Sequence, residues 1–267
     1  MEIKEVFVKY AKEIYLVPIG DWHVGNINCD KDKIDEYIEW IGKTPNMYWV
    51  GMGDYADCIN PKDYRFDLST IDPEFLPSRE DRNLLIGKQF DWIRGRVEKI
   101  KEKCLGLHLG NHEFDIMKFT SYSNDVSNIC RDFDIPYLGY DALWVIRIMK
   151  GKEDVMSCNI HSTHGSTGAR YAGTKLSSVE RWASDFDADI YLYGHSHECL
   201  AHRDVKLWTD GKELRMGKRM YAITGSFLRG YVAGTTSYVE RKNMRPIKTG
   251  VVKLTIFPDR KDIHAET

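Results

Sequence analysis

Five short polar clusters occur along this chain, and each one follows directly after a run of apolar residues. The clusters are Asp21-Trp22-His23, Gly53-Asp54-Tyr55-Ala56-Asp57, Gly110-Asn111-His112-Glu113, His161-Ser162-Thr163-His164-Gly165 and Gly194-His195-Ser196-His197. Short apolar runs of this kind predict buried strands, so carboxylate, amide and imidazole groups are expected where successive strands end. An ordinary polar loop requires no such ligands. The five clusters together therefore favour a metal site over five independent surface loops.

The first half of the chain alternates predicted strands and helices. Residues 14–19 read IYLVPI and predict a buried strand, and apolar residues at helical spacing predict a helix over 31–43 with Asp30 as its N-cap. The next elements are a strand over 47–52, a helix over 79–103, a strand over 104–109 and a helix over 124–133. Alternation of this kind is typical of an α/β fold.

Strands dominate the second half. Segments 142–149 and 154–160 flank Gly151-Lys152 and predict a hairpin, and Asp210-Gly211 predicts a second hairpin turn. The other expected elements are a helix over 174–186 and strands over 189–193, 200–208, 218–224 and 250–257. The shift in pattern indicates more than one sheet. In such folds, ligands bind at the carboxyl ends of the strands.

The chain length of 267 residues fits one large domain or two small ones. We expect a single domain over residues 1–267, with an insertion of a loop and a helix at about 58–103 that caps the active site. Tyr55, Tyr64, Arg65 and Phe66 lie in or beside this region. They are candidates to cover the pocket, and exposed loop side chains are the equally good alternative.

The net charge of −2 excludes a bulk electrostatic argument for a polyanionic partner. The charges are nevertheless unevenly spread. Residues 200–250 hold eleven Lys and Arg against four Asp and Glu, whereas residues 54–81 hold three against eight. A basic C-terminal face would suit a phosphate-bearing substrate, and chance clustering on a solvated surface explains the counts equally well.

The six cysteines form no CxxC pair, which indicates reduced thiols in a reducing compartment. A membrane span is not expected, since no run of about 18 apolar residues occurs. The first residues, Met1 to Glu5, show no signal-peptide pattern, and we expect a cytoplasmic protein.

Taken in order, the five clusters resemble the motifs of the calcineurin-like metallophosphoesterase superfamily. That family's pattern runs D-x-H, G-D-x-x-D, G-N-H-E/D, an H often followed by G, and G-H-x-H, and the resemblance spans roughly residues 14–197. One motif alone is weakly specific, whereas the ordered set of five is specific. The resemblance implies a four-layer αββα sandwich with two mixed central sheets. It also implies a metal-dependent phosphoester hydrolase.

The resemblance further implies a dinuclear centre. Asp54 would bridge two divalent cations about 3.5–4 Å apart, so that a shared hydroxide attacks phosphorus in line. The ligands implied besides Asp54 are Asp21, His23 and His197 for the first metal, and Asn111, His164 and His195 for the second. Oxygen and imidazole ligands suit several metals, of which we favour manganese and keep iron, zinc and nickel as alternatives.

By the same resemblance, His112 is the catalytic histidine. It would protonate the leaving oxygen or stabilise charge on the phosphoryl group, and the alternative is a further metal ligand or a buried structural histidine. Asp57 and Glu113 are expected to contact the metal ligands, not the metals, and to hold those ligands in place; ordinary surface carboxylates are the alternative.

His161 and His164 compete for one ligand position. The family pattern favours His164, because it directly precedes Gly165, whose small size would let the backbone pass close to the metals. His161 would then orient a ligand through a hydrogen bond or merely finish its strand.

Arg170, Tyr171 and Lys175 are candidates to contact a second phosphate or a nucleic-acid backbone, and exposed loop side chains are the alternative. The leading function is a phosphodiesterase or nuclease, supported by the basic C-terminal third and the long insertion. A phosphomonoesterase acting on nucleotides or phosphoproteins is the close alternative. A catalytically silent binding scaffold is disfavoured, because His112 and every ligand position are intact. The natural substrate and the oligomeric state stay open.

Overall fold

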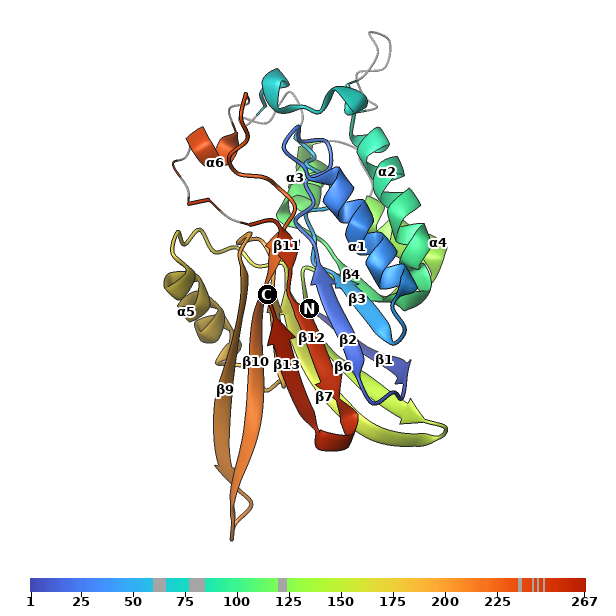
Figure 1. Ribbon diagram of the computed structural model, residues 1–267, viewed down its shortest axis with the longest axis vertical. Coiled ribbons are helices and arrows are strands. Elements are labelled where there is room, and N and C mark those ends of the chain that lie inside the picture. The colour runs from blue at the N-terminus through green and yellow to red at the C-terminus, as the bar shows by residue number, and fades with distance from the viewer. Residues whose placement is uncertain are drawn as a thin grey trace.

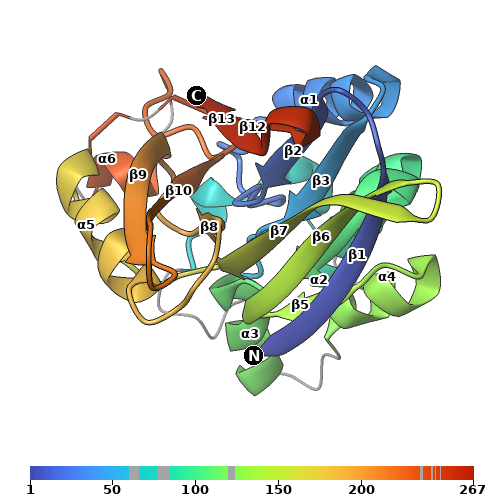
Figure 2. The ribbon, with the colours of Figure 1, turned by 90° about the horizontal axis from the view of Figure 1, so that it is seen from below.

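In the computed structural model the chain is described over residues 1–59, 66–76, 85–119, 124–234, 237–241, 243, 245–246 and 248–267. The described residues form two mixed β-sheets that pack face to face, with helices on both outer sides (Figures 1 and 2). This is the four-layer α/β arrangement expected from the sequence, and it is confirmed.

The six-stranded sheet carries the first three polar clusters. Its described strands, in spatial order, are β13 (Asp262–Glu266), β12 (Lys253–Phe257), β2 (Ile14–Ile19), β3 (Met47–Gly51), β4 (Cys104–His108) and β5 (Tyr137–Gly139). β2, β3 and β4 are parallel neighbours. Their carboxyl ends therefore lie at one edge of the sheet, where the residues that follow each strand meet.

The seven-stranded sheet carries the last two clusters. Its described strands are β1 (Glu2–Lys9), β6 (Asp141–Lys150), β7 (Glu153–Thr163), β8 (Ile190–Tyr193), β10 (Leu214–Ser226) and β11 (Gly250–Val251), with β9 (Cys199–Thr209) paired to β10. β7 and β8 run parallel, and Thr163 pairs with Tyr193. The two strands therefore end level with each other, which brings His164 and His195 together.

Apolar side chains of both sheets fill the space between them. Leu16 and Val50 from one sheet and Ile160 and Leu192 from the other belong to this core, and each is at most 1% exposed. Complete burial of one such side chain contributes about 1.5–3 kcal/mol relative to leaving it in water. The packing of the sheets thus holds the two sets of strand ends against each other.

Helices cover the outer faces. α1 (Lys31–Lys43), α2 (Leu85–Ile100) and α4 (Asp125–Phe133) lie on the six-stranded sheet, and α5 (Ala172–Ala183) lies on the seven-stranded sheet (Figure 1). α1 occupies the predicted residues because Ile34, Ile38 and Ile41 recur on one buried face. None of the described helices is both long and apolar enough to cross a membrane.

Several elements differ from the sequence expectation. Asp30 occupies the N-cap position of α1 but makes no side-chain capping bond. The helix expected over 79–103 is described from Leu85 to Ile100 and ends in a 3-10 turn, Lys101–Lys103; residues 77–84 lie outside the described part. The structure also contains β1, β5, β13, α3 (Asn111–Phe119) and α6 (Tyr238–Arg241), which the sequence did not predict. α3 begins within a polar motif that carries no clear helical repeat of apolar residues.

Candidate metal centre

The five predicted clusters converge at the shared edge of the two sheets. Among the described residues, side chains form three sets, and within each set the ligand atoms lie within 4.8 Å of one another. These sets are Asp21 with His23 and His197, Asp54 with His164 and His195, and His23 with Asp54 and His112. All seven predicted metal ligands are thus brought together or, for Asn111, placed beside the second set.

Asp21, His23 and His197 form the first set. His197 Nε2 lies 3.2 Å from Asp21 Oδ1 and 3.1 Å from His23 Nε2. Asp21 and His23 are buried at the end of β2, whereas His197 reaches them from the other sheet. Burial works to raise the pKa of Asp21, but the hydrogen bond and charge of His197 outweigh it and lower the pKa.

The second set includes the amide of Asn111. Its side-chain oxygen lies 3.0 Å from His164 Nε2, 2.8 Å from His195 Nδ1 and 3.2 Å from Asp54 Oδ2. A turned amide would place its nitrogen within reach of all three atoms, and its two N–H groups could donate to two of them without a cation. With the oxygen inward, four lone-pair atoms converge, and a cation is what satisfies them. Carboxylate, amide and imidazole donors of this kind fit a divalent metal.

Asp54 belongs to the second set and also to the set with His23 and His112. Its Oδ1 accepts a 2.9 Å hydrogen bond from the backbone N–H of His112, and its Oδ2 lies 3.2 Å from His164 Nε2. The carboxylate is 1% exposed, and burial works to raise its pKa. The charges of His164 and His112 outweigh this effect and hold the pKa of Asp54 well below its usual value, so the ionised form is ready to bridge cations.

The far nitrogen of each key imidazole faces an oxygen. His164 Nδ1 lies 2.7 Å from the carbonyl oxygen of Met52, and His112 Nδ1 lies 2.6 Å from that of Asp57. His23 Nδ1 lies 3.5 Å from Asp57 Oδ1. Donation of Nδ1–H by His164 and His112 fixes these two rings and directs His164 Nε2 at the cluster. Burial works to lower the pKa of His164, but the charge of Asp54 outweighs it and raises the pKa to about 10, and a bound cation would take the place of the proton on Nε2.

Glu113 ties two strand ends together. Its Oε2 accepts hydrogen bonds of 3.0 Å from the backbone N–H groups of Asp54 and Gly110, and its Oε1 accepts one of 3.0 Å from Ala56. Burial and the charge of Asp54 raise the pKa of Glu113 to about 7. Glu113 therefore holds the Asp54 loop and the start of α3 in a fixed relation.

The backbone is unusual where the ligands stand. The residues Asp21, His23, Asp54, His195 and His197 all have φ between 50° and 62°. This left-handed region costs most residues free energy, but Asp and His tolerate it better than branched side chains do. Such concentrated strain is typical of functional sites.

Two glycines let the strand ends touch. A Cβ on Gly53 would lie 2.7 Å from Gly110 Cα and 2.8 Å from His164 Nδ1. A Cβ on Gly110 would lie 2.1 Å from the backbone nitrogen of Asp54. The expected close approach at Gly165 is different: its Cβ would meet the Tyr193 ring at 2.3 Å, so the small residue accommodates an aromatic side chain and not the cluster.

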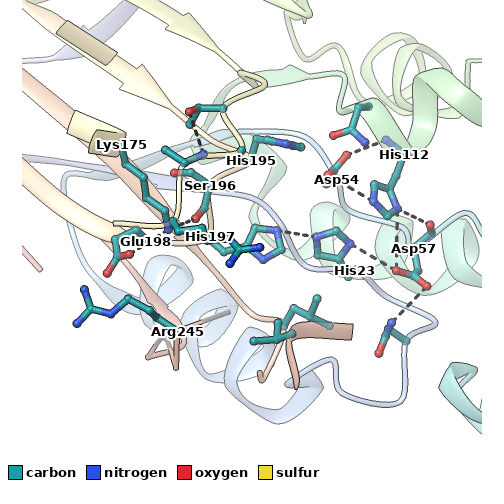
Figure 3. Close-up of a pocket in the computed structure, with 18 of the residues that line it drawn as sticks. His23, Asp54, Asp57, His112, Lys175, His195, Ser196, His197, Glu198 and Arg245 are labelled. Carbon is teal, nitrogen blue, oxygen red and sulfur yellow. Dashed lines mark hydrogen bonds and ion pairs between the residues drawn. The ribbon is translucent and has the colours of Figure 1, made fainter. Parts of the chain in front are cut away.

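A cavity of about 450 Å³ opens beside the cluster. His23, Asp54, Asp57 and His112 line one end, and Figure 3 shows Lys175, Glu198 and Arg245 on the opposite side. The other charged residues that line it include Arg170 and Arg241. Arg241, Arg245 and Glu198 were not singled out from the sequence; the basic excess in residues 200–250 was the signal that contained both arginines.

His161 does not join the cluster. Its ring stacks on Trp182 with a centroid distance of 4.0 Å, and its Nε2 lies 3.1 Å from Asp141 Oδ1. Successive residues of a strand point to opposite faces, and His161 of β7 points to the face under α5. Among the described residues its contacts are with Asp141 and the aromatic rings under α5 and with no candidate ligand, so the expectation that it orients a metal ligand is not supported.

Some residues expected at the pocket lie elsewhere. Tyr55 is 2% exposed and packs edge-to-face on Trp22, and Phe66 packs against the core under α1 and α2. Neither caps the cavity, because both are taken up by the apolar core. Tyr64 and Arg65 lie outside the described residues. Tyr171 is 64% exposed and does not line the cavity, although its neighbour Arg170 does.

Comparison with known proteins identifies the class. The sequence model of the calcineurin-like phosphoesterase family matches residues 16–199, more than half of the chain. The chain therefore belongs to this family and is a metal-dependent phosphoester hydrolase, in a family that uses a dinuclear divalent metal centre.

The solved structures that it resembles are distant in sequence. A metallophosphoesterase from Sphaerobacter thermophilus shares 14% identity over 95% of this chain and 89% of that chain, with a TM-score of 0.38. Zinc-bound Vps29 from Entamoeba histolytica shares 12% over 95% and 97%, with a TM-score of 0.37. NAD nucleotidase from Haemophilus influenzae shares 11% over 96% and 49%, with a TM-score of 0.39. The comparison with curated proteins finds no match.

Proposed function

We propose that this chain is a dinuclear phosphodiesterase that acts on nucleic acid, with manganese as the favoured metal. The observation that carries the proposal is the position of Asp54. Its carboxylate belongs to the set with His164 and His195 and also to the set with His23 and His112, and His23 is shared with the set of Asp21 and His197. These sets lie beside a cavity large enough for an extended substrate.

The proposed ligands of one metal are Asp21, His23, Asp54 and His197, and those of the other are Asp54, Asn111, His164 and His195. Asp57 and Glu113 hold these groups in place by the contacts described above. When bound, a cation pair supplies a water of lowered pKa and neutralises charge on the phosphoryl oxygens.

His112 is the proposed acid. Its Nδ1 is fixed by the carbonyl oxygen of Asp57, its Nε2 lies 4.0 Å from Asp54 Oδ2, and the residue lines the cavity. A protonated Nε2 at this position donates its proton to the oxygen that leaves as the ester bond breaks. A role as a further metal ligand is the alternative, because His112 also completes a set with His23 and Asp54.

The choice of a diester rests on the shape and charge of the cavity. Beyond the cluster the cavity continues along Thr167, Gly168 and Arg170, and a phosphate with two ester groups would use this space. We also propose that the chain is one domain whose insertion at about 58–103 forms a wall of the site, since Ile59 and Thr70 line the cavity. The six free thiols support a cytoplasmic location.

The test compares bis-p-nitrophenyl phosphate with p-nitrophenyl phosphate as substrates. In manganese, the diester is expected to be turned over faster, and EDTA is expected to stop both reactions. A clear preference for the monoester would favour the phosphomonoesterase alternative. An absence of hydrolysis with manganese, iron, zinc and nickel alike would favour a binding scaffold.

A further inference from the structure

The two ends of the cavity carry opposite chemistry. One end holds the carboxylates and imidazoles of the candidate metal centre. On the opposite side lie Lys175 and Arg245, as Figure 3 shows, and Arg170 and Arg241 also line the cavity. A cavity that is built for cations at one end and also presents guanidinium groups suits a ligand with more than one phosphate.

Two of these four cations are already paired. Lys175 Nζ lies 3.0 Å from Glu198 Oε2 and donates a 2.7 Å hydrogen bond to the carbonyl oxygen of Ser196, and the lysine is only 5% exposed. Arg241 Nη1 lies 3.0 Å from Asp67 Oδ2, a contact that uses few of its donors. Lys175 is therefore a structural group, whereas the exposed guanidinium of Arg241 retains donors for a ligand.

Arg170 and Arg245 form no ion pair within the described part of the chain. The guanidinium carbon of Arg245 lies 5.8 Å from the ring centroid of Tyr171, which positions the group without neutralising it. Two positive charges at the rim of the cavity are thus left without a carboxylate among the described residues. Guanidinium groups also match the geometry of phosphate, since they donate two parallel hydrogen bonds.

The three arginines come from distant parts of the sequence. Arg170 lies just before α5, at the end of the loop after β7, whereas Arg241 ends α6 and Arg245 follows it. What they share is the lining of this one cavity. Convergence of separate segments on one cavity favours a binding site over a charge run along one exposed segment.

We propose that Arg170, Arg241 and Arg245 form a second phosphate subsite, which binds the phosphate next to the scissile one in a single-stranded nucleic acid. This inference rests on the proposed diesterase function. A substrate with one phosphate has no group for this subsite. The exposed ring of Tyr171 beside Arg245 offers a surface on which an unpaired base stacks, and a base-paired strand could not use it.

The experiment uses the full chain in manganese with two probes, a single-stranded hexadeoxynucleotide and bis-p-nitrophenyl phosphate. Arg170→Met and Arg245→Met are each expected to lower kcat/KM for the hexanucleotide about 10-fold more than for the small diester. Each change is also expected to reduce the slope of log kcat/KM against log salt by about one. Arg181→Met, an exposed arginine of α5 outside the cavity, is the matched control.

Other outcomes overturn the subsite. Equal losses on both probes would mean that the arginines support the fold or the metals, and no loss on the hexanucleotide would mean that they contact no phosphate. Preference for the duplex form of the same sequence would contradict the single-stranded assignment.

The subsite and the diesterase function fail in different ways. Binding of a fluorescent hexanucleotide, measured by anisotropy in EDTA, does not depend on turnover. The variant tested combines Arg170→Met with Arg245→Met. If wild type binds the hexanucleotide and this double variant binds it at least 10-fold more weakly, the subsite stands even where hydrolysis is absent. If wild type hydrolyses bis-p-nitrophenyl phosphate but both proteins bind equally, the subsite alone fails.

Discussion

The two sheets supply different halves of the candidate metal centre. The strand ends of the six-stranded sheet contribute all the oxygen ligands, from Asp21, Asp54 and Asn111, together with His23. The strand ends of the seven-stranded sheet contribute imidazoles, from His164, His195 and His197. The centre exists only where the two sheets meet.

The halves are also supported differently. Ligands of the six-stranded sheet are held from within that sheet, by Glu113 and Asp57. Those of the seven-stranded sheet are held across the interface: His164 Nδ1 faces the Met52 carbonyl oxygen, and the His195 N–H donates to Asp21 Oδ2. The oxygen half is therefore organised on its own, and it aligns the imidazole half.

The largest effect is expected within the oxygen half. His112→Ala removes the proposed acid and is expected to lower kcat for bis-p-nitrophenyl phosphate by about 10²–10⁴-fold while metal content is retained. Asp54→Asn is the contrasting variant, because it weakens both proposed sites and is expected to lose metal as well as activity. Elemental analysis with steady-state kinetics distinguishes the two. Loss of metal in His112→Ala would make His112 a ligand, and wild-type rates would remove it from catalysis.

A smaller effect is expected in the imidazole half, where Lys175 is a support from its own side. Its hydrogen bond to the Ser196 carbonyl oxygen holds the loop on which His195 and His197 stand with positive φ. Lys175→Met is expected to weaken manganese binding about 10-fold, the lower end of the effect of groups that orient ligands.

Manganese titration measures this effect, with Lys206→Met as the control. Lys206 is a partly exposed lysine of β9 that pairs with Asp187 and lies away from the loop. Unchanged manganese affinity in Lys175→Met, with weaker hexanucleotide binding, would instead place Lys175 in the substrate site.

The last prediction concerns stability and the contact between the sheets. His108 of β4 lies 2.7 Å from Ser162 Oγ of β7 and 3.1 Å from the Gly139 carbonyl oxygen. Burial lowers the pKa of His108 from 6.5 to about 4, so the folded protein keeps it neutral while the unfolded chain protonates it. Stability is therefore full above about pH 6.5 and is lost as the pH falls towards 4.

Urea unfolding at pH 7 and pH 5 measures this loss. His108 is expected to account for about 2 kcal/mol of the difference, and His108→Gln is expected to shrink the difference by that amount. An unchanged pH dependence in the variant would show that other groups cause the acid sensitivity.

Much of the centre could be predicted from local sequence. The strand over 14–19 and the helix over 31–43 have the predicted bounds, because an unbroken apolar run and a helical repeat are properties of adjacent residues. Asp21 and Asp54 follow parallel strands of one sheet, so the ends of these strands bring them to one edge, and His195 likewise follows a strand of the other sheet. The family resemblance favoured His164 over His161 as the ligand. The structure supplies a physical reason, because side chains of a strand point alternately to its two faces and His161 points to the face under α5.

Other features depend on contacts between distant segments. Tyr55 and Phe66 look like pocket residues in sequence but are buried in the core, while Arg241 and Arg245 look like surface charges but line the cavity. The residue type alone does not tell whether such a side chain lies in the core, on the surface or in the cavity. The packing of distant segments around it decides this.

The sequence by itself determined which chemical groups stand at the strand ends and in what order, since strand, turn and glycine preferences act over a few residues. Only the tertiary structure decided that oxygen ligands from one sheet meet imidazoles from the other, and that arginines 70 or more residues apart share one cavity with them. The physical reason is that these positions are set by the burial of apolar faces between the sheets, a property of the whole chain that no single segment carries.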